Sequence, residues 1–489
     1  MKIFIKFYSE IIVKSKSARK YFIKSLNYNI KNIFLKQYQI KLRIDTKIDL
    51  MVINLNRNDT SLTVQEYIEI LQRISGIEQL LCVEEYPLND LQDMANIVVD
   101  KMTDKIAGYS FNVRVKRKGK HEFKSIDVEK YIGGALNQAV ESARVQLKNP
   151  DTSVKIEIID DVFFLIQKKY QGLGGYPIGT QGEALSLISG GYDSCISSYY
   201  MMKRGCKLHY CLFNLGQREQ TIEVKKIVHF LWKKYGSSHN VKLVVVDFGD
   251  LINEIVSKID NGLMGIVLKR MFLYFADFLA KKYNIPAIVT GESIGQVSSQ
   301  TLINLNQINK ISDTLVVRPL ISMNKSDIIN EARNIGIHHL SDQITEYCGV
   351  ISKNPRIESH LEEIEEEEKK LSLTLIEEIK KNIITYDIKD LDKVEAPISQ
   401  VEIIDDIKKL SDDDVIIDIR DIWEQEKKPL DIAKQSVLSI PFFKLISEFN
   451  NLEQSKNYFL YCEFNTMSKI QALHLHEKGH ANVKVLKIK

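Results

Sequence analysis

The stretch Leu185-Ser-Leu-Ile-Ser-Gly-Gly-Tyr-Asp-Ser194 decides the fold of the central part of this chain. Apolar residues run into a Ser-Gly-Gly turn, and a helical pattern begins near Asp193. This order predicts a buried parallel strand, a tight turn and a helix N-terminus. Glycine lets backbone N–H groups approach an anion closely, and the helix N-terminus adds a partial positive charge. The stretch therefore predicts a phosphate-binding loop.

Length and charge indicate several domains and a polyanionic partner. A chain of 489 residues is too long for one hydrophobic core. Residues 1–57 hold thirteen Lys and Arg against three Asp and Glu, although the net charge of the whole chain is only +3. This asymmetry favours nucleic acid as a partner of the N-terminal part, and a solvated basic face is the alternative.

Cysteine usage and hydropathy bear on the compartment. Six cysteines without a CxxC pair make neither a disulfide framework nor a zinc site, so we expect a reducing, cytoplasmic location. The apolar start Met1–Lys14 is interrupted by Lys6 and Glu10, which argues against a signal peptide. No charge-free apolar run is long enough to span a bilayer, so we expect no membrane association.

A basic strand is predicted at Ser110–Lys118, where apolar residues alternate with polar ones. Its exposed basic edge is expected to comprise Arg114, Lys116, Lys118 and Lys120. Such an edge could follow the phosphates of a nucleic acid. The alternative is an edge strand that its lysines protect from pairing with other chains.

From about Gly182 to Leu391, strand-like runs alternate with helical ones. The strand-like runs are Leu185–Ile188, Lys207–Phe213, Lys242–Asp247 and Ala287–Thr290. This alternation predicts a parallel sheet with helices on both faces. Ligands of such sheets bind beyond the carboxyl ends of the strands.

Ser189-Gly-Gly-Tyr-Asp-Ser194 matches SGGxDS and resembles the PP-loop of ATP pyrophosphatases. The resemblance implies cleavage of ATP between its α- and β-phosphates, which leaves an adenylated substrate and pyrophosphate. The residues expected to donate to phosphate are Ser189, Gly190, Gly191 and Ser194. Asp193 is expected to hold Mg²⁺ or to orient a lysine, and a simple helix N-cap is its alternative.

A second site is predicted where a strand ending at Tyr461 is followed by Cys462, a six-residue loop and a helix from about Ser468. This layout resembles the active site of rhodaneses. A thiol at a helix N-terminus has a lowered pKa and can carry a persulfide, so Cys462 is the predicted carrier. A buried structural cysteine is the alternative. Asn465 stands where glycine is usual, and asparagine tolerates positive φ.

Taken together, these motifs resemble the tRNA 4-thiouridine synthetase (ThiI) family, and Arg114-Val-Lys-Arg-Lys-Gly-Lys-His121 resembles part of a THUMP domain. The resemblance implies an α/β multidomain chain, with a ferredoxin-like α+β module, a THUMP domain, a doubly wound PP-loop ATP pyrophosphatase domain and a rhodanese domain. The boundaries that we expect for these parts are 1–60, 61–168, 182–391 and 408–489, with linkers at 169–181 and 392–407.

The resemblance also implies the reaction, in which ATP and Mg²⁺ adenylate uridine 8 of a tRNA and a persulfide on Cys462 supplies sulfur to give 4-thiouridine. Cys348, in Glu346-Tyr-Cys-Gly-Val350, matches the family's disulfide partner of the persulfide cysteine. The implied ATP contacts are the backbone at Leu187 and Ile188, together with Lys269, Gly291 and Gln300. Lys325 either reaches the phosphates or is a surface lysine.

The implied partners are tRNA, a cysteine desulfurase and a ThiS-type sulfur carrier protein of thiamine synthesis, and the sequence leaves a homodimer open. Gln217 and Gln220 depart from the family, which has a glycine and a histidine there. Four other cysteines are interpreted as core residues: Cys82, Cys195, Cys206 and Cys211. Two alternatives stay open, namely a PP-loop enzyme with another nucleophile and a non-catalytic tRNA-binding protein.

Overall fold

The computed structural model describes residues 1–55, 62–215, 218–342, 354–391, 401–420, 422–430, 432, 435–462 and 466–488. The chain divides into two compact units. The first contains Met1–Gln181, Met202–Cys206 and Ser237–His239, and the second contains the rest. In the part that the structure describes, no helix is both long and apolar enough to cross a bilayer.

An eight-stranded sheet runs through the first unit in the order β2-β3-β1-β4-β8-β7-β5-β6. Its strands are β1 (Lys2–Phe7), β2 (Ile44–Thr46), β3 (Leu50–Asn54), β4 (Ile77–Pro87), β5 (Ser110–Lys118), β6 (Arg144–Val145), β7 (Thr152–Ile159) and β8 (Val162–Gln171). The long antiparallel pair of β4 and β8 joins the two halves of this sheet.

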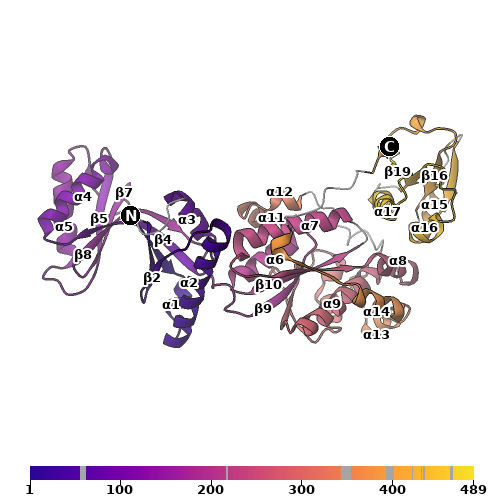
Figure 1. The fold of residues 1–489 in the computed structure, drawn as a ribbon, viewed down its shortest axis with the longest axis horizontal. Coiled ribbons are helices and arrows are strands. Elements are labelled where there is room, and N and C mark those ends of the chain that lie inside the picture. The colour runs from indigo at the N-terminus through magenta and orange to yellow at the C-terminus, as the bar shows by residue number, and fades with distance from the viewer. Residues whose placement is uncertain are drawn as a thin grey trace. The chain divides into compact units, whose positions relative to one another are not determined.

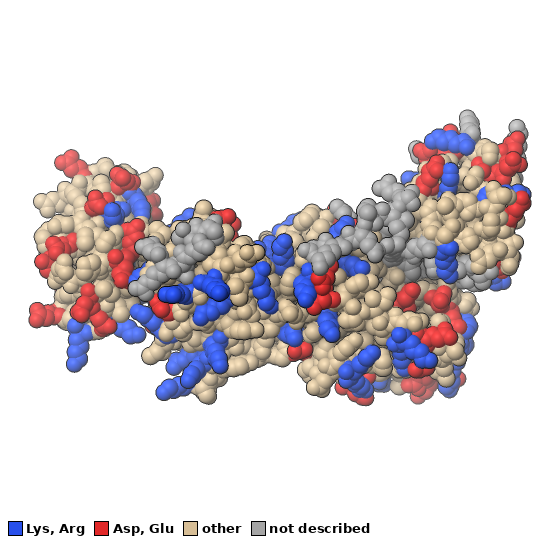
Figure 2. All heavy atoms as spheres, in the orientation of Figure 1, with Lys and Arg blue, Asp and Glu red and all other residues tan. Residues whose placement is uncertain are grey.

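Three helices cover one face of the N-terminal half: α1 (Ser9–Ile12), α2 (Lys16–Tyr38) and α3 (Val64–Gln72). Ser15 caps the N-terminus of α2, and the helix ends at Tyr38 because the next residue, Gln39, has a φ of 58°. Its apolar side is buried against the sheet. Its outer side exposes Lys16, Lys20, Lys24 and Lys31. Figure 2 shows Lys and Arg side chains gathered over this part of the molecule.

Helices α4 (Leu91–Ile106) and α5 (Ser125–Ala139) cover the other half of the sheet (Figure 1). The apolar side of α4 lies in the core, with Met94, Val98 and Ile106 fully buried. The sequence pattern extends the second helix to Arg144, but α5 ends at Ala139. The reason is that Arg144 and Val145 pair with β5 as the short strand β6, so strand pairing overrides the local helical pattern.

The second unit contains a six-stranded sheet in the order β13-β12-β9-β10-β11-β14. The strands are β9 (Glu183–Leu187), β10 (Lys207–Asn214), β11 (Lys242–Asp247), β12 (Ala287–Val289), β13 (Leu315–Val317) and β14 (Ile384–Asp387). The first five are parallel, and four of them match the predicted strands, whereas β13 was not predicted and β14 runs antiparallel to β11. An antiparallel edge strand is common on otherwise parallel sheets.

Helices cover both faces of this sheet (Figure 1). They are α6 (Tyr192–Lys203), α7 (Arg218–Leu231), η2 (Trp232–Gly236), α8 (Gly249–Lys258), α9 (Met264–Tyr283), η3 (Ser298–Gln300), α10 (Leu302–Asn309), α11 (Lys325–Asn334), α12 (His338–Ser341), α13 (Leu361–Glu368), α14 (Leu373–Lys381) and η4 (Ile388–Asp390). Strand β9 lies between β10 and β12, so the strand order reverses there. A ligand crevice is expected at this switch point.

The acidic stretch Glu358–Glu368 contains the helix α13, which packs against the rest of the domain through one side. Ile364 of α13 is fully buried, and Glu368 accepts two hydrogen bonds, at 2.6 and 3.0 Å, from the guanidinium of Arg270. Arg270 lies in α9 and is only 3% exposed, so its charge requires this carboxylate partner. Four other glutamates of α13 are exposed: Glu362, Glu363, Glu365 and Glu366.

The C-terminal part contains a five-stranded parallel sheet in the order β15-β19-β18-β16-β17. Its strands are β15 (Ile403–Ile404), β16 (Val415–Asp418), β17 (Ser436–Ser439), β18 (Tyr458–Tyr461) and β19 (Val483–Leu486). Its helices are η5 (Ile407–Lys409), α15 (Ile422–Lys427), α16 (Phe442–Phe449) and α17 (Thr466–Glu477). Ile417, Leu460 and Val485 are fully buried in its core.

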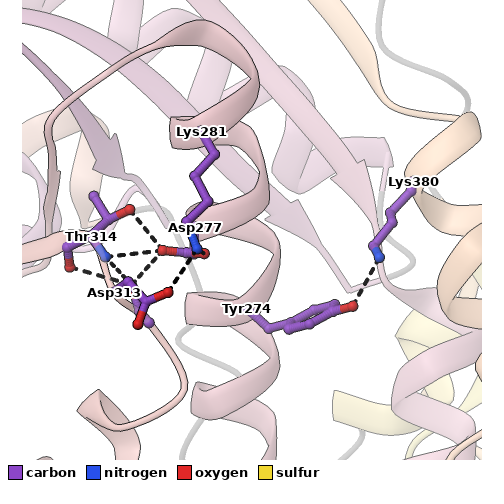
Figure 3. A network of polar contacts seen from close by, with 7 residues as sticks. Tyr274, Asp277, Lys281, Asp313, Thr314 and Lys380 are labelled. Carbon is purple, nitrogen blue, oxygen red and sulfur yellow. Dashed lines mark hydrogen bonds and ion pairs between the residues drawn. The ribbon is translucent and has the colours of Figure 1, made fainter.

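A polar network around Asp277 fixes the loop before β13 (Figure 3). The Asp277 carboxylate accepts hydrogen bonds from the Thr314 N–H at 3.0 Å and the Thr314 hydroxyl at 2.7 Å. It also accepts from the Ser312 hydroxyl at 3.0 Å and pairs with Lys281 at 2.7 Å. Burial opposes ionisation of Asp277, but these partners outweigh it and lower its pKa to about 2.

Replacing Asp277 with asparagine is expected to lower the free energy of unfolding by about 1–3 kcal/mol, because a charged acceptor of four donors is lost. The contribution of Asp277 is complete above the ordinary carboxyl pKa and disappears as pH falls through about 2. Urea denaturation of the full chain at several pH values measures both effects. Asp313→Asn, at a side chain that is 93% exposed, is the matched control. Equal losses in the two variants would contradict this role of Asp277.

Candidate active site

The predicted phosphate loop lies between β9 and α6, at the carboxyl end of the parallel sheet. Gly190 has a φ of +88°, a conformation that favours glycine. The Ser194 hydroxyl donates to the Gly191 carbonyl at 2.9 Å and accepts from the Ser189 N–H at 3.3 Å. These bonds hold the loop in a closed turn at the start of α6.

Asp193 orients a lysine across this loop. The ammonium group of Lys325, the first residue of α11, lies 2.9 Å from both carboxylate oxygens of Asp193. The Gln296 amide donates to one of these oxygens at 2.8 Å. This position of the Lys325 ammonium group favours a role at the phosphates over that of a surface lysine. These three donor contacts use part of the acceptor capacity of the Asp193 carboxylate and fix its orientation.

A second loop follows β12 and lies against the first. A Cβ atom added to Gly291 would lie 2.6 Å from the carbonyl carbon of Asp193 and 2.8 Å from the Ser194 nitrogen. Real Cβ atoms do not approach backbone so closely, so this position requires glycine. The sequence prediction singled out Gly291 for ATP binding, and in the structure it also permits the close contact of the two loops.

The neighbouring Glu292 gathers two cations. It accepts from Lys269 of α9 at 3.2 Å and from Arg318 at 2.8 Å. Burial opposes ionisation of Glu292, but the charges and hydrogen bonds of Lys269 and Arg318 hold its pKa below the usual value. The three groups leave one net positive charge beside the loops, which suits an anionic ligand.

Replacing Gly291 with alanine is expected to reduce ATP-dependent pyrophosphate release about 100-fold, because displacement of a loop by about 1 Å misplaces reacting groups. Gly265→Ala in α9 is the matched control, since a Cβ there meets no atom within 4 Å. Pyrophosphate release at the unmodified rate in Gly291→Ala would contradict the importance of this contact.

Two buried polar atoms near these loops have no protein partner in the described part of the chain. They are Oε1 of Gln300 and Nη2 of Arg318. A buried polar atom without a partner is unfavourable unless a ligand or water completes its bonding. Together with the Gly291 contact and the cation cluster, these atoms fit a nucleotide. Leu187 and Ile188 lie at the end of β9, where the Ile188 N–H donates to the Cys211 carbonyl at 2.9 Å.

Cys462 follows β18 directly and is 7% exposed. Its Sγ atom accepts a hydrogen bond from the Ser468 N–H at 3.3 Å and lies 3.4 Å from the Ser468 hydroxyl. Ser468 belongs to the first turn of α17, so the thiol lies at a helix N-terminus that stabilises negative charge on sulfur. The predicted strand, cysteine and helix are therefore in place, and Asn465 lies outside the described residues.

A buried ion pair supports the same end of the C-terminal sheet, and the sequence prediction did not find it. Arg420 is 4% exposed and donates from Nη2 to Asp418 at 2.6 Å. Its guanidinium lies 5.0 Å from the centre of the Tyr461 ring, next to Cys462. The Asp-x-Arg pattern after a buried strand is the only sequence signal for this pair.

The other five cysteines, and the two glutamines that differ from the family pattern, lie partly inside and partly outside the described residues. Cys348 and Gln217 lie outside the described residues. Gln220 lies in α7, and its Oε1 is buried with no hydrogen-bond partner among the residues that the structure describes. The core assignment of Cys82, Cys195, Cys206 and Cys211 is confirmed by their burial. Burial raises the pKa of Cys195 to about 12, so it is a poor nucleophile despite its place beside the loop.

The predicted basic edge on β5 is exposed at all four positions: Arg114, Lys116, Lys118 and Lys120. Arg114 donates to the Leu147 carbonyl at 2.8 Å and lies 3.5 Å from Glu129. Lys118 lies 3.8 Å from Asp49. These contacts hold two of the basic side chains without burying them.

Within the described ranges, no cluster of three or more His, Cys, Asp or Glu side chains could hold a metal ion.

Comparisons with known proteins now decide the family. Residues 179–373 match a family described as thiamine biosynthesis protein (ThiI), residues 86–166 match the THUMP domain, and residues 2–80 match the ThiI ferredoxin-like domain. Proteins named tRNA sulfurtransferase from Shigella dysenteriae and Escherichia coli are each 46% identical over 486 residues, covering 99% of this chain and 99% of theirs. The chain belongs to the tRNA sulfurtransferase (ThiI) family. The predicted family and fold class are thereby confirmed.

A solved structure supports the same assignment to the tRNA sulfurtransferase family. A 4-thiouridine synthetase in complex with RNA and bound ATP has 25% sequence identity and a TM-score of 0.68. The similarity covers 79% of this chain and 99% of that one. The three family matches end at residue 373, and the full-length relatives extend over the C-terminal parallel sheet, Cys462 and α17 as well.

Proposed function

We propose that this chain is an ATP-dependent tRNA uracil 4-sulfurtransferase that converts uridine 8 of tRNA to 4-thiouridine. The observation that carries the proposal is the combination of two sites in one chain. One is the SGGxDS loop with its Asp193–Lys325 pair, and the other is the Cys462 thiol at the N-terminus of α17. The named relatives support the choice of tRNA as substrate.

Adenylation is proposed at the first site. Ser189, Gly190, Gly191 and Ser194 hold the phosphates of ATP, while Lys325 and Lys269 supply positive charge. The O4 atom of the uridine attacks the α-phosphorus, and pyrophosphate leaves. Leu187, Ile188, Gly291 and Gln300 are proposed as further ATP contacts. Mg²⁺ is proposed to arrive on the phosphates of ATP, because magnesium keeps several water ligands and is usually bound through substrate phosphates and one or two carboxylates.

Sulfur transfer is proposed to use both cysteines. The terminal sulfur of a persulfide on Cys462 attacks C4 of the adenylated uridine, and AMP leaves. The Cys348 thiolate then attacks the sulfur of Cys462, so the bond between that sulfur and the transferred sulfur breaks. Both bonding electrons stay with the transferred sulfur as 4-thiouridine. A Cys348–Cys462 disulfide remains, and an external dithiol returns it to two thiols.

The remaining parts of the chain are proposed to bring the substrates together. The ferredoxin-like and THUMP parts bind the tRNA, with Arg114, Lys116, Lys118 and Lys120 contacting phosphates. The C-terminal sheet acts as a rhodanese domain that a cysteine desulfurase loads with sulfur. The same persulfide serves a ThiS-type carrier protein in thiamine synthesis. Such thiol chemistry needs a reducing compartment, which fits the cytosol.

The experiment that tests this proposal measures 4-thiouridine in unmodified tRNA after incubation with the chain, ATP, cysteine and a cysteine desulfurase. We expect 4-thiouridine at one position, with one pyrophosphate released for each thionucleoside. Pyrophosphate release without a thionucleoside would instead support a PP-loop enzyme with another nucleophile. Absence of both products with tRNA that binds would support a non-catalytic tRNA-binding protein.

The disulfide step makes a separate prediction for Cys348. Cys348→Ser is expected to accept a persulfide on Cys462 at the normal rate but to stop after one turnover or fewer, because no thiol resolves the Cys462 sulfur. Persulfide labelling and time courses of thionucleoside formation measure the two steps. Many turnovers by Cys348→Ser would refute the disulfide step. Cys206→Ser provides a control for the loss of a thiol outside the proposed chemistry.

A further inference from the structure

The carboxylate of Glu292 lies between two cations beside the proposed ATP loops. Its Oε1 atom accepts a hydrogen bond from Lys269 at 3.2 Å. Its Oε2 atom accepts from Nε of Arg318 at 2.8 Å and from the Thr290 hydroxyl at 3.1 Å. The Glu292 side chain is only 12% exposed, so its charge needs a cationic partner at all times. Two cations are one more than this carboxylate requires.

Arg318 uses only one of the two donors with which an arginine usually binds a carboxylate side-on. Arg270 donates to both oxygens of Glu368, from Nε at 2.6 Å and from Nη2 at 3.0 Å. Arg420 binds its aspartate in the same way, at 2.9 and 2.6 Å. The Nη2 atom of Arg318, in contrast, is buried and has no partner among the described residues. Its second donor is therefore unused, although its Nε already reaches Glu292.

Lys269 has bonding capacity left for a ligand. An ammonium group carries three donors, and in the part of the chain that the structure describes Glu292 is the one acceptor of Lys269. Lys269 lies in α9, and its side chain is 19% exposed. The guanidinium of Arg318 is held from its other edge as well, because Nη1 donates to the Asn309 amide oxygen at 3.2 Å. The lysine is thus the cation that can move to a phosphate, and the arginine is the one that stays.

We propose that Glu292 and Arg318 are positioning residues that hold Lys269 before ATP binds and release it to the phosphates when ATP binds. The lysine leaves Oε1 of Glu292, and Nη2 of Arg318 takes its place on that oxygen. The carboxylate is then bonded by both arginine donors, as Glu368 is, so no buried charge is left unpaired. ATP binding thereby completes the bonding of a buried donor without touching it. This inference rests on the proposed function, because it assumes that Lys269 binds the phosphates.

The exchange makes a specific prediction for the KM for ATP, measured by pyrophosphate release from the full chain at saturating tRNA. Arg318→Met removes the group that replaces the lysine, so Glu292 retains Lys269. The KM is expected to rise about tenfold, the effect of losing one hydrogen bond to a charged group. The kcat is expected to change less than about threefold, because saturating ATP still draws the lysine to the phosphates. Lys310→Met, which removes an exposed charge of the same domain, is the control and is expected to keep the KM within about twofold.

Two double variants distinguish this role from a structural one. Glu292→Gln combined with Arg318→Met removes the carboxylate that retains the lysine, so the KM is expected to return to within about twofold of normal. In a chain with Lys269→Ala, adding Arg318→Met is expected to leave the KM unchanged, because no lysine remains to be released. A KM that stays as high in the first double variant as in Arg318→Met would overturn the inference, as would a normal KM in Arg318→Met itself.

Stability measurements and one single variant complete the test. Thermal unfolding midpoints identify any variant that fails to fold, and the cycle with Lys269→Ala decides the outcome if Glu292→Gln is such a variant. A loss of kcat with a normal KM in Arg318→Met would reveal a merely structural role and overturn the inference. Normal KM and kcat in Lys269→Ala alone would instead refute the contact between this lysine and ATP in the proposed function.

Discussion

Replacing Cys462 with serine is expected to abolish 4-thiouridine formation while ATP-dependent pyrophosphate release continues. The Cys462 sulfur accepts a hydrogen bond from the Ser468 N–H at the start of α17, a geometry that stabilises negative charge on sulfur. A serine hydroxyl cannot carry a persulfide, so the sulfur donor is lost and the adenylation site is not. We expect a loss of about 10³-fold or more, as for removal of a covalent nucleophile. Thionucleoside analysis of the tRNA measures it.

The control for Cys462→Ser is Cys206→Ala, which removes another buried thiol. We expect this variant to retain thionucleoside formation. Sulfur incorporation by Cys462→Ser at the normal rate would show that the persulfide is carried elsewhere. A parallel loss of pyrophosphate release in Cys462→Ser would show that the C-terminal sheet has a different role from the one proposed.

Replacing Lys325 with alanine is expected to reduce pyrophosphate release by about 10²–10³-fold, the usual effect of removing one oriented charge from a transition state. Lys325 lies 2.9 Å from both oxygens of Asp193, which fixes its ammonium group beside the phosphate loop. Asp193→Ala is expected to have a similar effect, since it leaves the lysine without its orienting partner. Initial rates with saturating tRNA and ATP measure both variants.

A double-mutant cycle sharpens this prediction. If Asp193 acts through Lys325, the combined variant is expected to be about as slow as Lys325→Ala alone, because the two groups work as one unit. Lys310→Ala, a change on the same domain outside the loops, is the control. Fully additive effects of Asp193→Ala and Lys325→Ala would mean that Asp193 has a separate role, such as direct contact with Mg²⁺.

Local sequence patterns predicted the parts of the site that lie within one strand, turn and helix. The loop Ser189–Ser194 and the unit around Cys462 are of this kind, because their residues are neighbours in the chain. The Asp193–Lys325 pair joins residues 132 positions apart, so the sequence alone could not decide whether Lys325 contacts the phosphates or is a surface lysine. Glu292, which orients Lys269 and Arg318, was missed for the same reason.

Tertiary pairing decided the features that local patterns either predicted wrongly or did not reveal. The helical pattern beyond Ala139 gives way to β6, because β5 offers a free edge to Arg144 and Val145. The antiparallel direction of β14 depends on its pairing with β11, which no periodicity reveals. Gly291 is a third such feature. Position 291 requires glycine because the backbone that leaves no room for a side chain belongs to another loop. Each of these features depends on which elements meet in space.

The central claim is that one chain activates a tRNA uridine with ATP and then transfers sulfur from Cys462 to it. Its most direct measurement loads the chain with ³⁵S from labelled cysteine and a desulfurase, removes free label, and adds tRNA with or without ATP. The expected result is that label leaves Cys462 and appears in 4-thiouridine only when ATP is present. Label that stays on the protein with ATP, or reaches tRNA equally without ATP, would contradict the claim.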